Sequence, residues 1–373
     1  MKIKTITSHD VYNYGASLQA YALMTYLNSL GHETEIIDYK PEYVLRKYNY
    51  MWVNPESGWH INPIKRNIYR CLKFIQRQLT KPRKHSFDRF TRKYLQTTKT
   101  YHSNEELKSN PPFADIYIVG SDQVWNTFYD AGRDPAFYLD FVPTTSKRIS
   151  YAASFSFIEI NDFMKETISN YLHKFNAISV REYQGINILK EMQLEGEWVL
   201  DPIFLLPVEH WKSIMSPFSK KEKFILVYDF ERNSDIKSVA QQLKAKTGYK
   251  IYSINDNYPL FYADKNYNAA GPIEFLTLIY HCDYFLSNSF HGTAFSILFQ
   301  KNFFVFPRHR HKVNSRMESL LKLFQLEERL IPICYKKDSI YKNINYIPVS
   351  FILKQNIVKS KQYLKNNLTY KHA

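Results

Sequence analysis

The feature that most constrains the fold is the opening of the chain, where a strand, a loop, a helix and a second strand follow one another. Residues 2–7 predict a short β-strand and residues 8–14 a loop. The apolar side chains that follow recur at helical spacing up to Leu30, and Gly31 stands where a helix C-cap is expected. Residues 34–39 predict the second strand. Such a βαβ unit places its strands in parallel, so the chain is expected to be an α/β protein.

The same alternation continues through most of the chain. Short, β-branched runs predict buried parallel strands at 115–120, 148–153, 177–181, 198–201, 224–230, 250–254, 284–287 and 303–307. Helical spacing predicts helices at 162–175, 235–247, 272–282, 293–300 and 315–326. The stretch 204–223, which contains two prolines and a charged run, is expected to link two Rossmann-like halves.

These elements divide the chain into three parts. Residues 1–207 are expected to form an N-terminal Rossmann-like domain with a basic helical insertion at 43–112. Residues 208–349 are expected to form a C-terminal Rossmann-like domain. A last helical stretch, 350–373, is expected to cross back to the first domain.

The insertion carries most of the excess positive charge. Between Lys65 and Lys108 stand 13 Lys and Arg residues and three acidic ones, which is +10 of the net charge of +15. Pro63 and Pro82 bracket a helical stretch without a neighbouring strand. Five apolar residues form one stripe on it, with basic residues off the stripe (Ile64, Ile68, Leu72, Ile75 and Leu79; Arg66, Lys73 and Arg77). Either this is a solvated helix that covers the sheet, or the basic segment 64–108 makes a peripheral contact with an anionic membrane surface.

Several classes of protein find no support in the sequence. No apolar run approaches the roughly 18 residues of a membrane span, and the start of the chain lacks the apolar core of a signal peptide. The three cysteines are far apart, which argues against a disulfide framework. Neither a G-x-G-x-x-G nor a Walker loop is present, and no nucleic-acid-binding signature accompanies the basic segment. The expected location is therefore cytoplasmic, with the inner face of the cell membrane as the peripheral alternative.

Polar clusters follow five of the predicted strands, where ligands bind in open α/β sheets. They include Asn13 and Gly15 after the first strand, the run Ser121, Asp122, Gln123 and Trp125, and Arg181 beside Glu182. The last two are the turn 288–292 and the run Arg308, His309, Arg310 and His311.

The turn Asn288-Ser289-Phe290-His291-Gly292 has the strongest physical case. Ser289 is a candidate N-cap, and Gly292 would let backbone approach a ligand at the start of the next helix. Free N–H groups and the positive end of the helix dipole favour an anion there. His291 is the candidate acid/base residue; the alternative is a histidine that only packs in the crossover.

Arginines supply the candidate anion clamps. Arg181 ends a strand, and Arg308, Arg310, Lys312 and Arg316 follow the last one. Each could bind a carboxylate or phosphate, or belong to a surface ion pair. Trp125 could stack on a sugar face. No metal site is expected, because the histidines lack ligand spacing.

Taken together, these segments resemble the polysaccharide pyruvyl transferase family. The resemblance rests on N-Y-G-A-S-L-Q-A-Y-A-L (13–23), I-I-D-Y (36–39), D-I-Y-I-V-G-S-D-Q-V-W-N (115–126), R-I-S-Y-A-A-S-F (148–155), I-S-V-R-E (178–182), V-L-D-P-I-F-L-L (199–206), L-S-N-S-F-H-G-T-A-F-S (286–296) and N-S-R-M-E-S-L-L (314–321). These segments run along nearly the whole chain.

The resemblance implies a glycosyltransferase-B-like fold, with two Rossmann-like domains facing a cleft. The first, 1–207, would lie on the acceptor side and the second, 208–349, on the donor side. The resemblance also implies phosphoenolpyruvate as donor substrate, no cofactor, and a hexose acceptor that is often lipid-linked, as in undecaprenyl-linked precursors of capsule, exopolysaccharide or cell-wall polymers. His291 and Arg181 match residues that contact the donor in the family. Some members place an arginine where this chain has Ser289, so part of the donor charge is expected to fall on Arg308 or Arg316.

The site expected from all this has two parts. His291 and Arg181 are the catalytic residues, with Asn288, Ser289, Gly292, Arg308 and Arg316 on the donor. Asn13, Gly15, Ser121, Asp122, Gln123 and Trp125 are assigned to the acceptor. The rival hypotheses are a glycosyltransferase that uses a nucleotide sugar on the same fold, and a non-catalytic component of a polysaccharide assembly complex.

Overall fold

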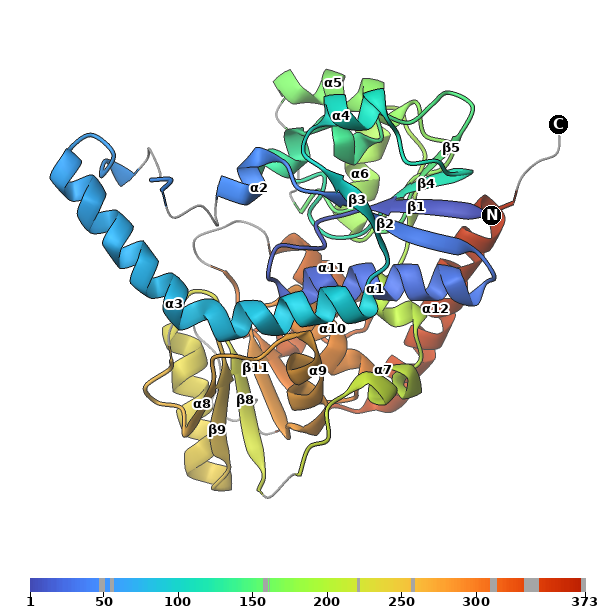
Figure 1. Ribbon diagram of the computed structural model, residues 1–373. Coiled ribbons are helices and arrows are strands. Elements are labelled where there is room, and N and C mark those ends of the chain that lie inside the picture. The colour runs from blue at the N-terminus through green and yellow to red at the C-terminus, as the bar shows by residue number, and fades with distance from the viewer. Residues whose placement is uncertain are drawn as a thin grey trace.

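The computed structural model describes residues 1–46, 51–53, 57–156, 160, 162–219, 222–255, 259–308, 314–331 and 342–369. Two five-stranded parallel sheets dominate it (Figure 1). The first has the order β3 (Thr97–Tyr101), β2 (Glu33–Tyr39), β1 (Lys2–Ile6), β4 (Ile116–Val119), β5 (Lys147–Ser150). The second has the order β10 (Lys265–Tyr267), β9 (Lys250–Ile254), β8 (Phe224–Tyr228), β11 (Tyr284–Ser287), β12 (Asn302–Val305).

The two sheets share one topology, in which the strand order reverses at a central pair. That pair is β1 and β4 in the first sheet and β8 and β11 in the second. A short two-stranded sheet, β6 (Ser179–Val180) with β7 (Glu197–Trp198), continues the first sheet through the bridge between Ala153 and Val180. The chain therefore has two Rossmann-like halves, as the alternation of strands and helices predicts.

Helices cover these sheets. Those of the first half are α1 (Tyr14–Ser29), α2 (Glu42–Arg46), α3 (Pro63–Tyr94), α4 (Asn104–Ser109), α5 (Asp162–Leu172) and α6 (Tyr183–Glu191). Those that follow are α7 (Val208–Ile214), α8 (Ser234–Thr247), α9 (Pro272–His281), α10 (Phe290–Leu298), α11 (Ser315–Leu323) and α12 (Tyr346–Asn367). Short 3-10 turns are η2 (Asp130–Arg133), η3 (Pro135–Tyr138), η4 (Pro202–Leu205) and η5 (Glu327–Arg329). With helices on both faces, β8 is buried along its whole length, which explains its unbroken run of apolar residues.

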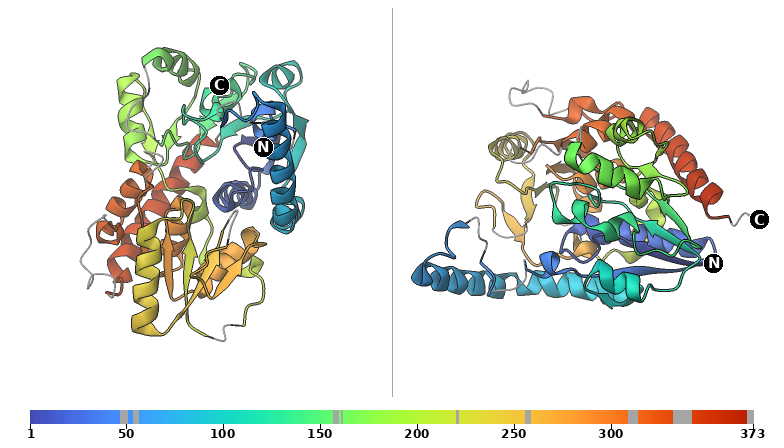
Figure 2. Two further views of the ribbon diagram at one scale, coloured as in Figure 1. Left: turned by 90° about the vertical axis from the view of Figure 1, so that its left-hand side faces the viewer. Right: turned by 90° about the horizontal axis from the view of Figure 1, so that it is seen from above.

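Helix α1 joins the two halves. Most of its residues are buried, and the side chain of Asn13 caps it by accepting from the N–H groups of Gly15 and Ala16. The Tyr14 ring stacks on Phe275 of α9 with 4.6 Å between centroids, and its hydroxyl donates to the carbonyl of Ala270. One apolar cluster accordingly runs through both halves. The left view of Figure 2 shows α1, in dark blue, between the two halves, and it contacts α9 and α10 of the second half.

Helix α12 also contacts both halves. At its start, the Tyr346 hydroxyl donates to the carbonyl of Lys301. Near its end, Ser360 Oγ accepts from the N–H of Leu200, and the Tyr363 hydroxyl donates to the carbonyl of Ser150.

One expectation drawn from the sequence is wrong in detail. The insertion 43–112 contains a strand, β3, which pairs with β2 at the sheet edge. Its sequence, TTKTY, is mostly polar because an edge strand buries little, so apolar patterning misses it.

The first part of the stretch between the two halves is packed against the protein. Trp211 of α7 is fully buried and donates to the carbonyl of Ile203.

Helix α3 is longer than Pro82 suggested. It continues through that proline to Tyr94, and it changes direction along its length (Figure 1). A proline inside a helix removes one hydrogen bond and clashes with the preceding turn, which bends the helix.

Candidate functional site

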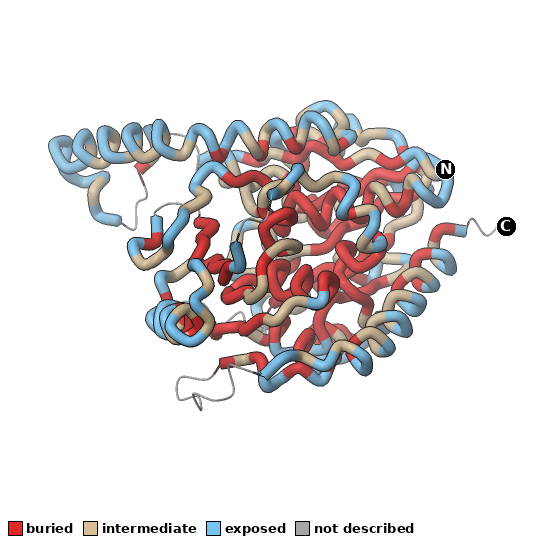
Figure 3. The backbone as a smooth tube through the Cα atoms, turned by 90° about the horizontal axis from the view of Figure 1, so that it is seen from below, coloured by how far each residue is buried: buried red, intermediate tan, exposed pale blue. Residues whose placement is uncertain are grey.

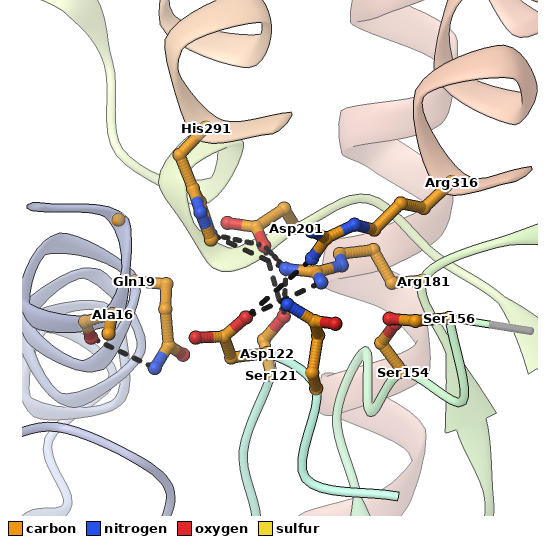
Figure 4. Close-up of polar contacts among 12 residues, drawn as sticks. Ala16, Gln19, Ser121, Asp122, Ser154, Ser156, Arg181, Asp201, His291 and Arg316 are labelled. Atoms are coloured by element: carbon orange, nitrogen blue, oxygen red, sulfur yellow. Dashed lines mark hydrogen bonds and ion pairs between the residues drawn. The ribbon is translucent and has the colours of Figure 1, made fainter. Parts of the chain in front are cut away.

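The candidate site lies where the carboxyl ends of the two sheets meet. Ser121 and Asp122 follow β4, Arg181 follows β6, and His291 lies in the first turn of α10 after β11. In Figure 4, His291 and Arg316 reach from helices of the second half toward Arg181, Asp122 and Asp201 of the first half. This is the switch-point position at which open α/β sheets bind ligands.

Asp201 lies at the centre of the cluster. Nη1 of Arg181 donates to Oδ2 of Asp201 at 2.9 Å, and Oγ of Ser121 donates to the same oxygen at 3.0 Å. Nε2 of His291 lies 3.3 Å from Asp201 Oδ2 and 3.4 Å from Nη1 of Arg181. One carboxylate thus positions both the histidine and the arginine.

Arg316 approaches the same place from α11. Its Nη1 lies 4.0 Å from Asp122 Oδ1, and Arg181 Nη2 lies 3.6 Å from that oxygen. With its oxygen turned toward Arg316, the Gln123 carboxamide accepts from Nη1 and Nη2 at 3.0 and 3.1 Å. Asp122 has a φ of +79°, a conformation that non-glycine residues rarely adopt and that concentrates at functional sites.

Burial and charge act differently on the two arginines. Burial lowers the pKa of Arg181, but the carboxylates of Asp201, Asp122 and Glu182 outweigh it and raise the pKa above its usual range. Burial and the neighbouring Arg181 lower the pKa of Arg316 to about 10. Arg316 is therefore the less compensated cation of the pair.

The arginines also carry buried hydrogen-bond donors without a partner. Within the described residues, Nε and Nη2 of Arg181 and Nε of Arg316 make no hydrogen bond. An unsatisfied buried donor costs about 1–3 kcal/mol or more when charged, so such groups call for an acceptor. An anion bound between these guanidinium groups would supply one. The face of Phe290 supports both groups, with its ring centroid 4.2 Å from Arg181 Cζ and 5.7 Å from Arg316 Cζ.

The carboxylate of Asp201 is held ionised. Burial would raise its pKa, but the charges and hydrogen bonds of His291 and Arg181 keep it well below its usual range. The negative charge of Asp201, 3.3 Å from Nε2 of His291, favours an orientation in which this ring nitrogen faces the carboxylate.

Gly15 has a role that its assignment to the acceptor did not foresee. A Cβ at Gly15 would lie 2.0 Å from His291 Nδ1 and 2.3 Å from its Cγ. The glycine thus allows α1 of the first half to pack directly against the histidine of the second half.

The turn before α10 is built by its own residues. Ser289 caps α10 by accepting from the Gly292 N–H at 3.2 Å. Asn288 accepts from the N–H of Phe230 and donates to Asp229, which fixes the neighbouring loop after β8. Gly292 makes room for the Phe285 ring, since its Cβ would lie 2.7 Å from Phe285 Cε1. Its lack of a side chain therefore serves packing against Phe285.

Two other assigned residues lie in different surroundings. Asn13 has its carboxamide oxygen engaged in capping α1. Arg308 Nε donates to Glu231 at 3.1 Å, so its charge is largely balanced. Arg310 and Lys312, with His309 and His311, lie outside the described residues.

The assignment of Trp125 to the acceptor is wrong. The side chain is fully buried, its Nε1 donates to the carbonyl of Phe137, and its ring packs on Tyr138 and Phe155. The turn after β4 directs Trp125 back into the core, so neither ring face is available to a sugar.

Three residues of the cluster were not assigned to the site from the sequence. Asp201 follows β7, so the rule that selected the other strand ends would have found it. The fully buried Glu182 accepts from Ser154 Oγ and the N–H of Ser156. Phe290 reads as a core residue in the sequence, and only the structure shows it beneath two guanidinium groups.

The comparisons with known proteins identify the family. The model of the polysaccharide pyruvyl transferase family matches residues 13–310. This is well over half of the chain, which therefore belongs to the polysaccharide pyruvyl transferase family and is a transferase. None of the curated proteins compared with the chain matches it.

Solved structures share the fold at low identity. They include a putative UDP-N-acetylglucosamine 2-epimerase from Listeria monocytogenes, at 10% identity and a TM-score of 0.54, covering 98% of this chain and 91% of that one. UDP-N-acetylglucosamine 2-epimerase from Rickettsia bellii has 11% identity and a TM-score of 0.52, with 99% of each chain covered. The S. aureus MnaA–UDP co-structure has 13% identity and a TM-score of 0.52, covering 100% and 99%. These likenesses show the fold, which is glycosyltransferase-B-like.

Proposed function

We propose that this member of the polysaccharide pyruvyl transferase family moves the pyruvyl group of phosphoenolpyruvate onto a hexose of a polysaccharide precursor and forms a cyclic ketal. The observation that carries the proposal is the pair of buried guanidinium groups of Arg181 and Arg316, with unpartnered donors, beside His291. Phosphoenolpyruvate has two anionic ends, a carboxylate and a phosphate, and such a pair suits either of them.

The chemistry needs one proton on carbon and two proton removals from oxygen. Protonation of the methylene carbon turns it into a methyl group and makes the neighbouring C2 electrophilic. A sugar hydroxyl then attacks C2 and loses its proton, and the C2–O bond to phosphate breaks. A second hydroxyl of the same sugar closes the ketal and loses its proton, which leaves with the phosphate. General acid–base catalysis of this kind contributes about 10²–10⁴-fold.

The residues divide this work by position. His291 is the acid/base group, with its ring oriented by Asp201 at 3.3 Å. Arg181 and Arg316 bind the donor and stabilise the negative charge on the departing phosphate. Asp122 and Gln123, on the loop after β4, are the candidates for the acceptor hydroxyls.

Ligand binding tests the donor first. Titration calorimetry with phosphoenolpyruvate, and separately with UDP, is expected to show binding of phosphoenolpyruvate alone. UDP is the informative comparison, because the S. aureus MnaA structure, which has a similar fold, contains bound UDP. Binding of UDP and not of phosphoenolpyruvate would instead favour a nucleotide-sugar glycosyltransferase. Binding of neither would favour a non-catalytic role.

Turnover tests the chemistry. Phosphate release from phosphoenolpyruvate is measured with a panel of hexose acceptors, and NMR identifies the methyl group and the ketal carbon of the product. The variant His291→Ala is expected to bind phosphoenolpyruvate but to lose at least about 100-fold in kcat. The control is His173→Ala, an exposed histidine at the end of α5. Wild-type turnover by His291→Ala would refute the acid/base assignment.

A further inference from the structure

Helix α3 consists of an anchored part and a projecting part. Its buried residues are Arg83, Phe87 and Phe90, all in the second half of the helix. Residues 63–80, here called the projecting segment, extend away from the body and are largely exposed (Figures 1 and 3). At 1.5 Å per residue, the helix reaches about 30 Å beyond Arg83.

The projecting segment exposes an apolar stripe. Five residues with spacings of three or four lie on one face, and each is between 48% and 76% exposed: Ile64, Ile68, Leu72, Ile75 and Leu79. Phe74, on the flank of the same helix, is 53% exposed. A surface helix normally turns its apolar face toward the core, and contiguous exposed apolar patches mark interaction sites.

The charge around the stripe indicates the partner. The sequence of α3 contains 11 Lys and Arg residues and one acidic residue, Asp88. At 3.6 residues per turn, the exposed Lys65 falls beside the stripe on one side and the exposed Lys81 beyond Phe74 on the other. Long basic side chains beside an apolar face can reach lipid headgroups while their stems stay in the apolar layer.

A second copy of the chain fits this surface less well. Pairing two stripes would bring two strongly basic helices together, and like charges in contact repel. An anionic lipid surface supplies the opposite charge, and each nearby Lys or Arg adds about 1 kcal/mol to its attraction. Within the described residues, no helix is both long enough and apolar enough to cross a bilayer.

We propose that the projecting segment of α3 binds the surface of a membrane that contains anionic lipids, with the apolar stripe inserted among the headgroups. The anchored part joins this surface to the site. Arg83 donates to the carbonyl of Tyr12, and the Tyr12 hydroxyl donates to Asp88. Tyr12 lies in the loop that leads to Asn13 and Gly15 beside His291, so membrane binding holds the site close to lipid-linked molecules. The proposal does not depend on the donor.

Vesicle flotation tests it with the full chain. The probe is a phosphatidylcholine vesicle in which about one lipid in three is the anionic phosphatidylglycerol. Vesicles of phosphatidylcholine alone serve as the uncharged comparison. The stripe variant is Ile68→Gln, Leu72→Gln, Leu79→Gln. The matched control is Ile347→Gln, Phe351→Gln, Val358→Gln, which removes three exposed apolar side chains from α12. Circular dichroism and analytical ultracentrifugation of each variant establish its fold and its oligomeric state.

Wild type and the α12 control are expected to bind the anionic vesicles, and binding should weaken with salt. The stripe variant is expected to lose at least about 100-fold in partition coefficient, since three apolar side chains no longer enter the lipid. Three results overturn the proposal: wild type binding neither vesicle, the α12 control losing binding as much as the stripe variant, or wild type being a dimer that the stripe variant dissociates. Phosphoenolpyruvate binding is measured separately, so failure here leaves the proposed function untouched.

Discussion

Replacing Gly15 by alanine is expected to disable the site without unfolding the protein. The new Cβ would lie 2.0 Å from His291 Nδ1, whereas real Cβ atoms essentially never come within 3.0 Å of another heavy atom. To bring this Cβ–Nδ1 distance from 2.0 to 3.0 Å, the imidazole or α1 must move by at least 1.0 Å. A displacement of about 1 Å at a reacting group costs about 100-fold in rate. We therefore expect Gly15→Ala to lower kcat for phosphate release by about 100-fold.

The effect on stability should be small by comparison. Overpacking costs about 1–3 kcal/mol, and alanine returns about 0.5–1 kcal/mol because it favours the helix over glycine. The control is Gly31→Ala at the other end of α1. Gly31 has a φ of +83° and no atom within 4 Å of an added Cβ, so this change strains the backbone without touching the site. It should lower the melting temperature and leave kcat unchanged.

A double-mutant cycle decides whether the loss passes through His291. If Gly15→Ala acts by displacing the ring, adding it to His291→Ala should cost almost nothing further. Retention of kcat within about threefold by Gly15→Ala would refute the reasoning. Additive losses in the double variant would refute it as well, because the glycine would then act on something other than the histidine.

Three further outcomes are expected. Arg316→Gln should weaken phosphoenolpyruvate binding by about 10–100-fold in calorimetry, since it removes a charge-assisted donor, while Arg308→Gln, at a residue already paired with Glu231, should change binding less. Asp201→Asn should flatten the acid limb of the stability–pH curve: the folded-state pKa of Asp201 is depressed, so its stabilising contribution is present above the unfolded pKa near 3.8 and is lost as pH falls toward the folded value. Chemical denaturation from pH 2 to 7, a range chosen to span roughly the carboxyl titration, measures this difference. Trp125→Ala should lower the free energy of unfolding by about 3–5 kcal/mol in denaturant unfolding. If the folded variant also used the acceptor less well, Trp125 would after all have a direct role in acceptor binding.

The sequence predicts the fold where burial leaves a pattern. Strand β8 (FILVY) is apolar along its length, and β11 (YFLS) is apolar up to its last residue, because helices cover both faces of the sheet; such strands can be recognised directly in the sequence. The edge strands β3 and β10 bury little and carry polar sequences, TTKTY and KNY, which no apolar pattern reveals. Propensity cannot replace the missing pattern there, because strand preference depends on its neighbours.

The site is predictable in location and less so in detail. Strand ends can be found one at a time from the sequence, and His291, Arg181, Asp122 and Arg316 do come together in the structure. The hydrogen-bond partners of their side-chain atoms, however, come from segments that are distant in the sequence. The contact of Gly15 with His291 joins opposite halves of the protein, and no local pattern encodes it. Trp125 shows the converse, since a residue in a promising loop can point into the core.

The two arginines considered for the donor charge can now be separated. Ser289 carries no charge, and its side chain already caps α10. The positive charge that balances a bound anion must therefore come from another element. Arg308 is a weak candidate, because Glu231 already lies 3.1 Å from its Nε. Arg316 has one carboxylate at 4.0 Å, and its burial, together with the neighbouring Arg181, lowers its pKa to about 10. A guanidinium pair under such repulsion gains most when an anion binds between its members, since the anion relieves the repulsion and also accepts their free hydrogen bonds. If the proposed function is right, we therefore expect Arg316 to carry the donor charge that Ser289 does not supply.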